Sequence, residues 1–438
     1  MSSKNTEDRF LGSLVGLAVG DALGTTNEFV PQHAVKPIAD IIGGGKFRLL
    51  PGMWTDDTSM ALCLAESIIE SSGKFDGVDQ QERYYRWYMD GHLSSTGKCF
   101  DIGKTVRKHL LENLKEKREF HPHISDGASG NGALMRMCPI TLLHSLLKFN
   151  DSVLYKSGLN SMTTHPSEIS RDCSRYFAAL IVGAINGATK QDLLKPLYTP
   201  SHLSSDYWEN NPLREEVLSV VRDQTYLSKT PPDIQNGAYV VISMEAALWG
   251  FFNYNSFEEG ALAISNLGDD SDTVAAIFGQ LAGAFYGFDG IPATWREKIT
   301  LLPLLICFSK ELHSMAVQFA ELEQKGLFSE ESTSQKSDTY VEMKQLNDLM
   351  ESEYALIMRK MDPSPRQYKS IDDFNKDVEV FESKYHDLAR TLSNVDECDK
   401  QSIFNDFHNR LMKRDKEPLE LMISRKSGMG SLFSGIRK

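Results

Sequence analysis

The sequence lacks the cysteine spacings of zinc sites and redox motifs. Its cysteines contain no C-x-x-C pair and lie at positions 63, 99, 138, 173, 307 and 398. The first 25 residues also lack a basic segment followed by an apolar one, the pattern of a secretory signal. We therefore expect reduced thiols and a cytoplasmic location.

Long apolar runs are also missing. The most apolar stretches, such as Leu301–Phe308, contain a proline and fall far short of the ~20 residues that a bilayer span requires. Alternating runs of β-branched and aromatic residues, typical of strands, are scarce, whereas apolar residues at helical spacing recur between residues 10 and 325. We therefore predict an all-α fold that does not span a membrane.

Excess positive charge is absent as well. The 438 residues carry a net charge of −13, which disfavours broad binding to nucleic acid or to anionic membranes. With 41% hydrophobic and 24% charged residues, the composition is that of a globular protein. An anionic ligand would need a local cation or a bound metal ion.

Glycine is concentrated at a four-residue spacing in two predicted helices. One carries Gly12, Gly16, Gly20 and Gly24, and the other Gly279, Gly283 and Gly287 among alanines. Because glycine inside a helix costs ~1 kcal/mol relative to alanine, this spacing indicates backbones that pack very closely.

The composition changes after Leu327, where the polar residues 329–336 suggest a linker. We predict a catalytic domain over 8–327 and a helical C-terminal extension over 338–438. The extension should contain amphipathic helices at Tyr340–Met361, Ile371–Thr391 and Lys400–Lys413, with Pro363 and Pro365 interrupting the chain after the first. For the basic tail, residues 424–438, a frayed end and a weak contact with a partner or an anionic surface both stay open.

An acidic pair lies in the motif W-T-D-D-T, residues 54–58, at the predicted start of a helix. In isolation, Asp56 and Asp57 suit helix capping. A second cluster, G-D-D-S-D-T at 268–273, stands at the head of the second glycine-rich helix. Carboxylates gathered in one place repel one another unless a cation lies among them, so the two clusters favour hard divalent ions such as Mg²⁺, Mn²⁺ or Ca²⁺. Adjacent carboxylates can each serve one of two ions ~3.5–4 Å apart.

A glycine-rich loop, residues 127–133, precedes the apolar stretch Leu134–Leu143, for which we predict a helix. Such loops let backbone N–H groups approach phosphate oxygens, although an ordinary turn has the same composition. The loop matches neither the P-loop motif nor a dinucleotide-binding fingerprint.

Together these motifs resemble the ADP-ribosylglycohydrolase family. The matching segments occur in order: G-x-x-x-G-D-A-L-G at 16–24 followed by Glu28, W-T-D-D-T at 54–58, G-N-G-A-L-M-R at 130–136, T-H-P at 164–166 and G-D-D-S-D-T at 268–273. The resemblance implies a compact helical bundle with two Mg²⁺ or Mn²⁺ ions in a central cleft.

The resemblance also implies a role for each matched residue. The metal ligands would be Thr55, Asp56, Asp57, Asp270, Asp272 and Thr273. The ADP-ribose site would contain Ser129, Gly130, Asn131, Gly132 and His165. The catalytic acids would be Glu28, Asp56 and Asp101, with Asp101 in a D-I-G segment like that of the arginine-directed branch. Lys104 departs from the small or amide residue expected there, and we expect Asp21 to be a buried supporting or capping residue.

We therefore expect a metal-dependent hydrolase that cleaves the ribose C1″ bond of ADP-ribosylated protein side chains, arginine above all, or of a related ADP-ribose conjugate. The alternatives are a catalytically silent ADP-ribose-binding module that recruits a partner through its C-terminal helices, and a two-metal phosphoesterase on another helical scaffold. The extension should supply no catalytic group, and instead pack on the core or bind a protein partner.

Overall fold

The computed structural model describes residues 3–148, 151–329, 332–361, 368, 370–416 and 418–420. No strand occurs in these ranges, only the isolated bridges Gly44–Leu49 and Gly130–Tyr239. The all-α prediction is confirmed. None of the helices in these ranges is long and apolar enough to cross a membrane. Pro363, Pro365 and the basic tail at 424–438 lie outside the described residues.

The chain divides into two compact units, residues 1–336 and 337–438. The first unit begins with α1 (Ser3–Gly24), α2 (Asp56–Glu70), α3 (Gly77–Asp90), α4 (Lys104–Glu116), α5 (Cys138–His144), α6 (Ser152–Met162) and α7 (Glu168–Ile185). It continues with α8 (Lys190–Leu193), α9 (Tyr207–Asn210), α10 (Glu215–Val221), α11 (Val240–Asn253), α12 (Phe257–Ser265), α13 (Ser271–Tyr286), α14 (Ala293–Arg296) and α15 (Leu302–Gln324). Short 3₁₀ turns are η1 (Gln32–Ala34), η2 (Asp126–Ala128), η3 (Asn131–Ala133) and η4 (Thr225–Leu227).

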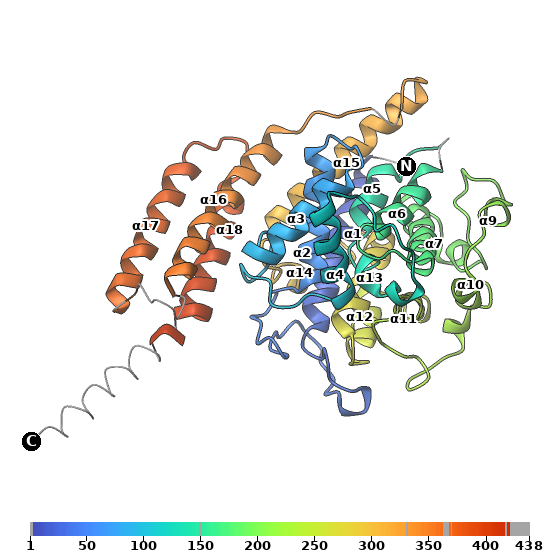
Figure 1. The fold of residues 1–438 in the computed structure, drawn as a ribbon, viewed down its shortest axis with the longest axis horizontal. Coiled ribbons are helices and arrows are strands. Elements are labelled where there is room, and N and C mark those ends of the chain that lie inside the picture. The colour runs from blue at the N-terminus through green and yellow to red at the C-terminus, as the bar shows by residue number, and fades with distance from the viewer. Residues whose placement is uncertain are drawn as a thin grey trace, which may run out of the picture. The chain divides into compact units, whose positions relative to one another are not determined.

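Helices α1 and α13 lie side by side in the middle of the first unit (Figure 1). A Cβ atom on Gly12, Gly16 or Gly20 would overlap the backbone of α13, and one on Gly279 or Gly283 would overlap the backbone of α1. The glycine spacing therefore marks two antiparallel helices in direct backbone contact, as predicted. Because the helices run in opposite directions, the end of α1 lies against the start of α13, where Ser271 Oγ donates a hydrogen bond of 2.8 Å to Gly24 O.

The start of α2 is held against α1 by one buried carboxylate. Asp21 Oδ1 accepts hydrogen bonds from Thr55 N and Thr55 Oγ1 at 2.9 and 3.0 Å, and Oδ2 accepts from Thr58 N and Thr58 Oγ1 at 3.0 and 2.6 Å. Asp21 thus caps α2 from a different helix, while the N-cap residue Thr55 makes no capping bond with its own side chain. The prediction of a supporting or capping role for Asp21 agrees with these contacts.

The predicted helix over Leu134–Leu143 begins later than expected. Residues 131–133 form a 3₁₀ turn, and α5 starts only at Cys138, with Pro139 in its first turn. The reason is the side chain of Gln280, which donates to Leu134 O and Met135 O at 3.1 and 2.8 Å and accepts from Cys138 N at 2.8 Å. These bonds replace the helical bonds of the segment, so the glycine-rich loop does not run directly into a helix.

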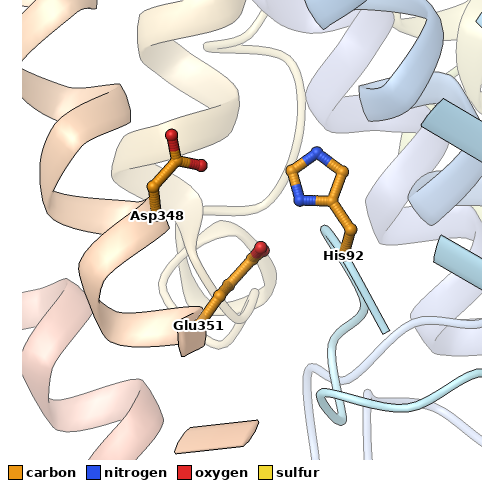
Figure 2. Close-up of side chains that lie close together, drawn as sticks. All are labelled: His92, Asp348 and Glu351. Atoms are coloured by element: carbon orange, nitrogen blue, oxygen red, sulfur yellow. The ribbon is translucent and has the colours of Figure 1, made fainter. Parts of the chain in front are cut away.

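The second unit contains α16 (Asp338–Met361), α17 (Ile371–Ala389), α18 (Glu397–Asn409) and the π-helical turn η5 (Arg410–Asp415). Its core is aromatic: Tyr385 stacks on Phe404 at 4.4 Å, and Tyr354 packs on Phe407 at 6.0 Å. The opposite faces are charged, and Figure 2 shows Asp348 and Glu351 extending from the same helix, α16, three residues apart.

Candidate active site

Acidic side chains from distant parts of the sequence meet at a cleft of about 310 Å³ in the first unit. The sequence-predicted residues that line it are Glu28, Asp56, Asp101, Gly130, Asn131, Gly132, His165, Asp270, Asp272 and Thr273. A larger cavity of about 620 Å³ lies beside the end of α7, but none of these residues lines it. We therefore take the smaller cleft, where the chemical groups converge, as the candidate site.

Thr55, Asp57 and Ser129 lie behind the cleft wall. Thr55 Oγ1, which donates to Asp21 Oδ1, also lies 2.8 Å from Asp57 Oδ2 and 3.3 Å from Asp272 Oδ2. One oxygen each of Asp21, Asp57 and Asp272 lies within 4.8 Å of the other two. The starts of α2 and α13 therefore bring their carboxylates into one buried cluster.

Two oxygens of this cluster have no hydrogen-bond partner in the structure. Asp57 Oδ1 and Asp272 Oδ1 are both buried and without one, whereas both oxygens of Asp21 accept two hydrogen bonds each. An unsatisfied buried carboxylate oxygen is costly unless it binds a cation. The cluster thus offers ligand atoms on Asp57 and Asp272, and a positioning role for Asp21.

Burial is the main cause of the electrostatic strain at the cluster. It raises the pKa of Asp57 and Asp272 well above the usual range, and neighbouring carboxylates add to the rise. The pKa of Asp56 is raised in the same way, by burial and then by Asp101. Burial also raises the pKa of Asp270, although hydrogen bonds from Asn131 and Thr273 oppose this. The folded chain therefore holds several acids that are hard to ionise together in the absence of a cation.

Glu28 lies on the cleft wall just beyond the end of α1. Its side chain is 4% exposed, and its Oε2 atom has no hydrogen-bond partner in the structure. Burial raises the pKa of Glu28 to about 9, and Asp56, Asp101 and Asp270 contribute to the rise. In the metal-free chain the carboxyl of Glu28 is therefore much harder to ionise than that of an exposed glutamate.

The glycine-rich loop also lines the cleft. It is fixed to the segment before α11 by Asn131 N donating to Ala238 O and Val240 N donating to Ser129 O, both at 3.0 Å. The Ser129 hydroxyl contacts the Ser167 hydroxyl at 2.6 Å, at the N-cap of α7. Asn131 Nδ2 then reaches across to Asp270 Oδ2 at 2.6 Å. The loop and the acids are thus parts of one hydrogen-bonded site.

Arg136 supports this loop from behind. Its buried guanidinium donates to Gly132 O, to Tyr84 Oη at 3.1 Å and to Thr164 Oγ1 at 2.7 Å. Thr164 Oγ1 in turn contacts His165 Nδ1 at 2.9 Å. Burial and the charge of Arg136 hold the pKa of His165 well below its usual range, so His165 lines the cleft as a neutral ring.

Asp101 enters the cleft from the segment before α4. Burial raises the pKa of its carboxyl, while Lys46 and a hydrogen bond from Ile102 N at 3.0 Å lower it. Lys104, which departs from the expected residue type, also lines the cleft.

Sequence reasoning missed several lining residues, among them Phe29, Thr105 and Ala238. Phe29 could have been suspected as the neighbour of Glu28, but an aromatic residue in a loop carries no chemical signal of its own. Thr105 and Ala238 have no sequence feature that distinguishes them.

Comparison with known proteins places most of the chain in one group. The model of the ADP-ribosylglycohydrolase family matches residues 2–327. The ADP-ribosylarginine hydrolase Tri1 of Pseudomonas putida is 38% identical over 318 residues, which cover 72% of this chain and 81% of that protein. The ADP-ribosyl-[dinitrogen reductase] glycohydrolase of Rhodospirillum rubrum is 30% identical over 307 residues, covering 69% of this chain and 93% of that protein. A solved structure, an ADP-ribosylglycohydrolase-related protein complex, superposes with a TM-score of 0.61 at 34% identity and covers 72% of this chain and 99% of that chain.

Proposed function

The chain belongs to the ADP-ribosylglycohydrolase family, and on that premise we propose that it hydrolyses the bond between the ribose C1″ atom and an arginine side chain, with divalent metal ions as cofactors. The observation that carries this proposal is the convergence of Glu28, Asp101 and the α2 and α13 carboxylates on one cleft with the glycine-rich loop. All of these groups lie in the first unit.

The residues fit a pair of hard divalent ions. Among the described residues, the buried oxygens Asp57 Oδ1 and Asp272 Oδ1 have no hydrogen-bond partner. Burial, and then neighbouring carboxylates, raise the pKa of both carboxyl groups, so a cation between them would favour their ionised forms. Carboxylate and hydroxyl oxygens are the ligands that Mg²⁺ and Mn²⁺ prefer. The residues that would hold the ions are Thr55, Asp56, Asp57, Asp270, Asp272 and Thr273. When bound, such ions orient ribose hydroxyls and lower the pKa of a water molecule.

The glycine-rich loop suits the diphosphate of ADP-ribose. Gly130 and Gly132 present backbone without side chains to the cleft, and a Cβ atom on Gly132 would lie only 3.0 Å from His165. Because His165 is neutral and buried, it adds no positive charge, and binding would rest on the backbone N–H groups.

Asp101 supports arginine as the leaving group. A carboxylate pairs with a guanidinium through charge-assisted hydrogen bonds, and Asp101 opens into the same cleft as Glu28 and Asp56. Two relatives are named as ADP-ribosylarginine hydrolases, which favours the same side chain here.

The remaining acids would handle protons. Breaking the C1″ bond creates positive charge on the ribose, which nearby carboxylates stabilise. Hydrolysis also moves a proton from the attacking water to the departing guanidine nitrogen. Glu28, whose pKa is raised by burial and by the neighbouring acids, would carry this proton, together with Asp56 in the same cleft. A silent binding module would have no need to bury unpaired carboxylates beside the loop, and a phosphoesterase would not need Asp101.

The test is release of ADP-ribose from free ADP-ribosylarginine, with ADP-ribosylserine as the competing substrate, in Mg²⁺ or Mn²⁺ and in chelator. We expect hydrolysis that requires metal and is faster for the arginine substrate than for the serine substrate. In Asp272→Asn, which alters a proposed metal ligand, the rate should fall at least about 100-fold, by analogy with the loss of activity when groups around a metal ion are changed. Asp269→Asn is the matched control, since Asp269 lies in the same motif but is exposed and does not line the cleft. Equal losses in both variants, or hydrolysis in chelator, would contradict the proposal.

A further inference from the structure

Positive charge is concentrated in two segments that reach the cleft, on a chain that is acidic overall. Two segments, residues 43–48 and 98–108, contain six cations and one carboxylate, that of Asp101, whereas the whole chain has a net charge of −13. All six cations are exposed, and we call them the basic rim: Lys46, Arg48, Lys98, Lys104, Arg107 and Lys108.

Aromatic rings join the two segments to the cleft. The Phe47 and Phe100 rings lie 4.9 Å apart, so the turn at 43–48 packs on the segment that contains Asp101. Lys46 Nζ lies 3.7 Å from the centre of the Phe29 ring, and Phe29 and Lys104 both line the cleft. The basic rim is therefore continuous with the Asp101 side of the site.

The turn that carries Lys46 and Arg48 is firmly held. Gly44 and Leu49 exchange two backbone hydrogen bonds of 2.8 and 2.9 Å. Thr26 Oγ1 donates to Gly43 O at 3.0 Å, and Gly45 is so close to Thr25 O that a Cβ atom would overlap it. The two cations are thus presented by a turn fixed to the end of α1, next to Glu28.

Phe29 combines a strained backbone conformation with an exposed side chain. Its φ of 61° is unusual for a bulky residue, and its backbone is locked by Phe29 N donating to Asp269 O and Asp269 N donating to Val30 O, each at 2.7 Å. The ring is nevertheless 51% exposed. Strain and exposure together favour a binding role over a packing role for this side chain.

Most of the rim charge is not neutralised within the chain. Among the described residues, no ion pair involves Lys46, Arg48, Lys104, Arg107 or Lys108. Exposed cations around an aromatic surface attract an acidic partner. A polypeptide fits better than a nucleic acid, because the acidic remainder of the chain would repel a long phosphate backbone.

We propose that the basic rim, with Phe29 at its centre, binds the acidic polypeptide that surrounds the modified side chain, so that the enzyme prefers ADP-ribosylated sites flanked by Asp or Glu. This inference rests on the proposed function, because it takes Asp101 to face the leaving side chain. The basic rim would add a preference for the residues around the modified side chain, whereas the cleft itself would recognise only ADP-ribose and that side chain.

The test compares two peptides of equal length with a central ADP-ribosylarginine, one flanked by Asp and Glu and the other by Lys, using the full chain in Mg²⁺. We expect kcat/KM to favour the acidic peptide about fivefold or more at low salt, given the modest strength of exposed ion pairs, and the preference to vanish as salt screens it. In the double variant Lys46→Glu with Arg48→Glu, the ratio between the two peptides should reverse. Any effect of the Lys46 charge on Asp101 cancels in the ratio of the two kcat/KM values, because the same ADP-ribosylarginine bond is broken in both peptides. Lys310→Glu, an exposed cation on α15, is the control and should keep the wild-type ratio.

Binding of the unmodified peptides by fluorescence anisotropy separates this inference from the proposed function. A chain that hydrolyses neither substrate yet binds the acidic peptide more tightly contradicts the hydrolase and supports the rim. Equal affinity for the two peptides, a ratio unchanged in the double variant, or tighter binding of a short oligothymidylate than of the acidic peptide would overturn the rim proposal.

Discussion

Asn131 donates a hydrogen bond of 2.6 Å to Asp270 Oδ2 and another of 2.9 Å to Ser243 Oγ, which joins the glycine-rich loop to the acids of α13. One amide thereby fixes the distance between the proposed diphosphate site and the proposed metal ligands. The two halves of the site come from residues more than a hundred positions apart, so this bond exists only in the folded chain.

Asn131→Asp should therefore harm the enzyme more than Asn131→Ala. The alanine variant loses both bonds, of which the one to the Asp270 carboxylate is worth about 2 kcal/mol, and should raise KM. The aspartate variant places a second carboxylate against Asp270 and should lower kcat as well. Steady-state kinetics on ADP-ribosylarginine check this, and equal kinetics in both variants would show that the bond is not part of the site.

Stability of the metal-free chain should fall as pH rises. The pKa of Glu28 is raised from 4.5 to about 9 and that of Asp21 from 3.8 to about 6, in both cases mainly by burial. Between the unfolded and folded values the native state binds more protons than the unfolded state, so the free energy of unfolding decreases with increasing pH. Thermal melts in chelator from pH 5 to pH 9 should show this slope. Saturating Mg²⁺ or Mn²⁺ should reduce it and add about 2.7 kcal/mol at 100 times the dissociation constant. A slope of opposite sign would contradict the raised pKa values of these buried acids. Identical slopes with and without metal would contradict metal binding at the acidic cluster.

Asp21→Asn should destabilise the fold and also impair catalysis. Asparagine replaces one carboxylate oxygen with an amide nitrogen that cannot accept, so the bonds donated by either Thr55 or Thr58 are lost. This loss should cost about 2 kcal/mol and loosen the start of α2. Asp40→Asn provides the comparison, because Asp40 is partly exposed and pairs with Lys298 at the surface, where the loss should stay below about 1 kcal/mol. Denaturant unfolding measures both, and similar small losses would mean that Asp21 does not hold α2 in place.

Gly20→Ala tests the contact between α1 and α13. Its methyl group would overlap the backbone of Ala275, which cannot move without separating the helices, so we expect a loss of about 3 kcal/mol or more. Gly237→Ala has open space around its Cβ and should change the free energy of unfolding by less than about 1 kcal/mol. If Gly20→Ala were as stable as Gly237→Ala, the glycine spacing would need another explanation.

Much of this arrangement could be predicted from the sequence because it depends on local spacing. The glycines at 12, 16 and 20 indicated a close helix contact, and that contact places the second acidic cluster beside the end of α1. Capping residues and the polar linker likewise leave local signals. The positions of α2, α16 and α17 follow from such signals to within a few residues.

Features that depend on contacts between residues far apart in the sequence could not be predicted from it. Gln280 delays the start of α5 from the middle of another helix, and Arg136 holds the glycine-rich loop through Tyr84 and Thr164. The contact between Phe47 and Phe100 joins the two segments that carry the basic rim, and nothing in the sequence of either segment indicates that they meet. No periodicity in the sequence reports which side chains meet across the fold.

The central claim is that the carboxylates of α2 and α13 hold catalytic divalent ions. Anomalous diffraction from crystals of the full chain grown with Mn²⁺ tests it most directly. The account predicts two Mn²⁺ peaks within ligand distance of Asp57 and Asp272, and the loss of at least one in Asp272→Asn. Absence of a peak at these carboxylates in crystals that bind Mn²⁺ elsewhere would contradict the account.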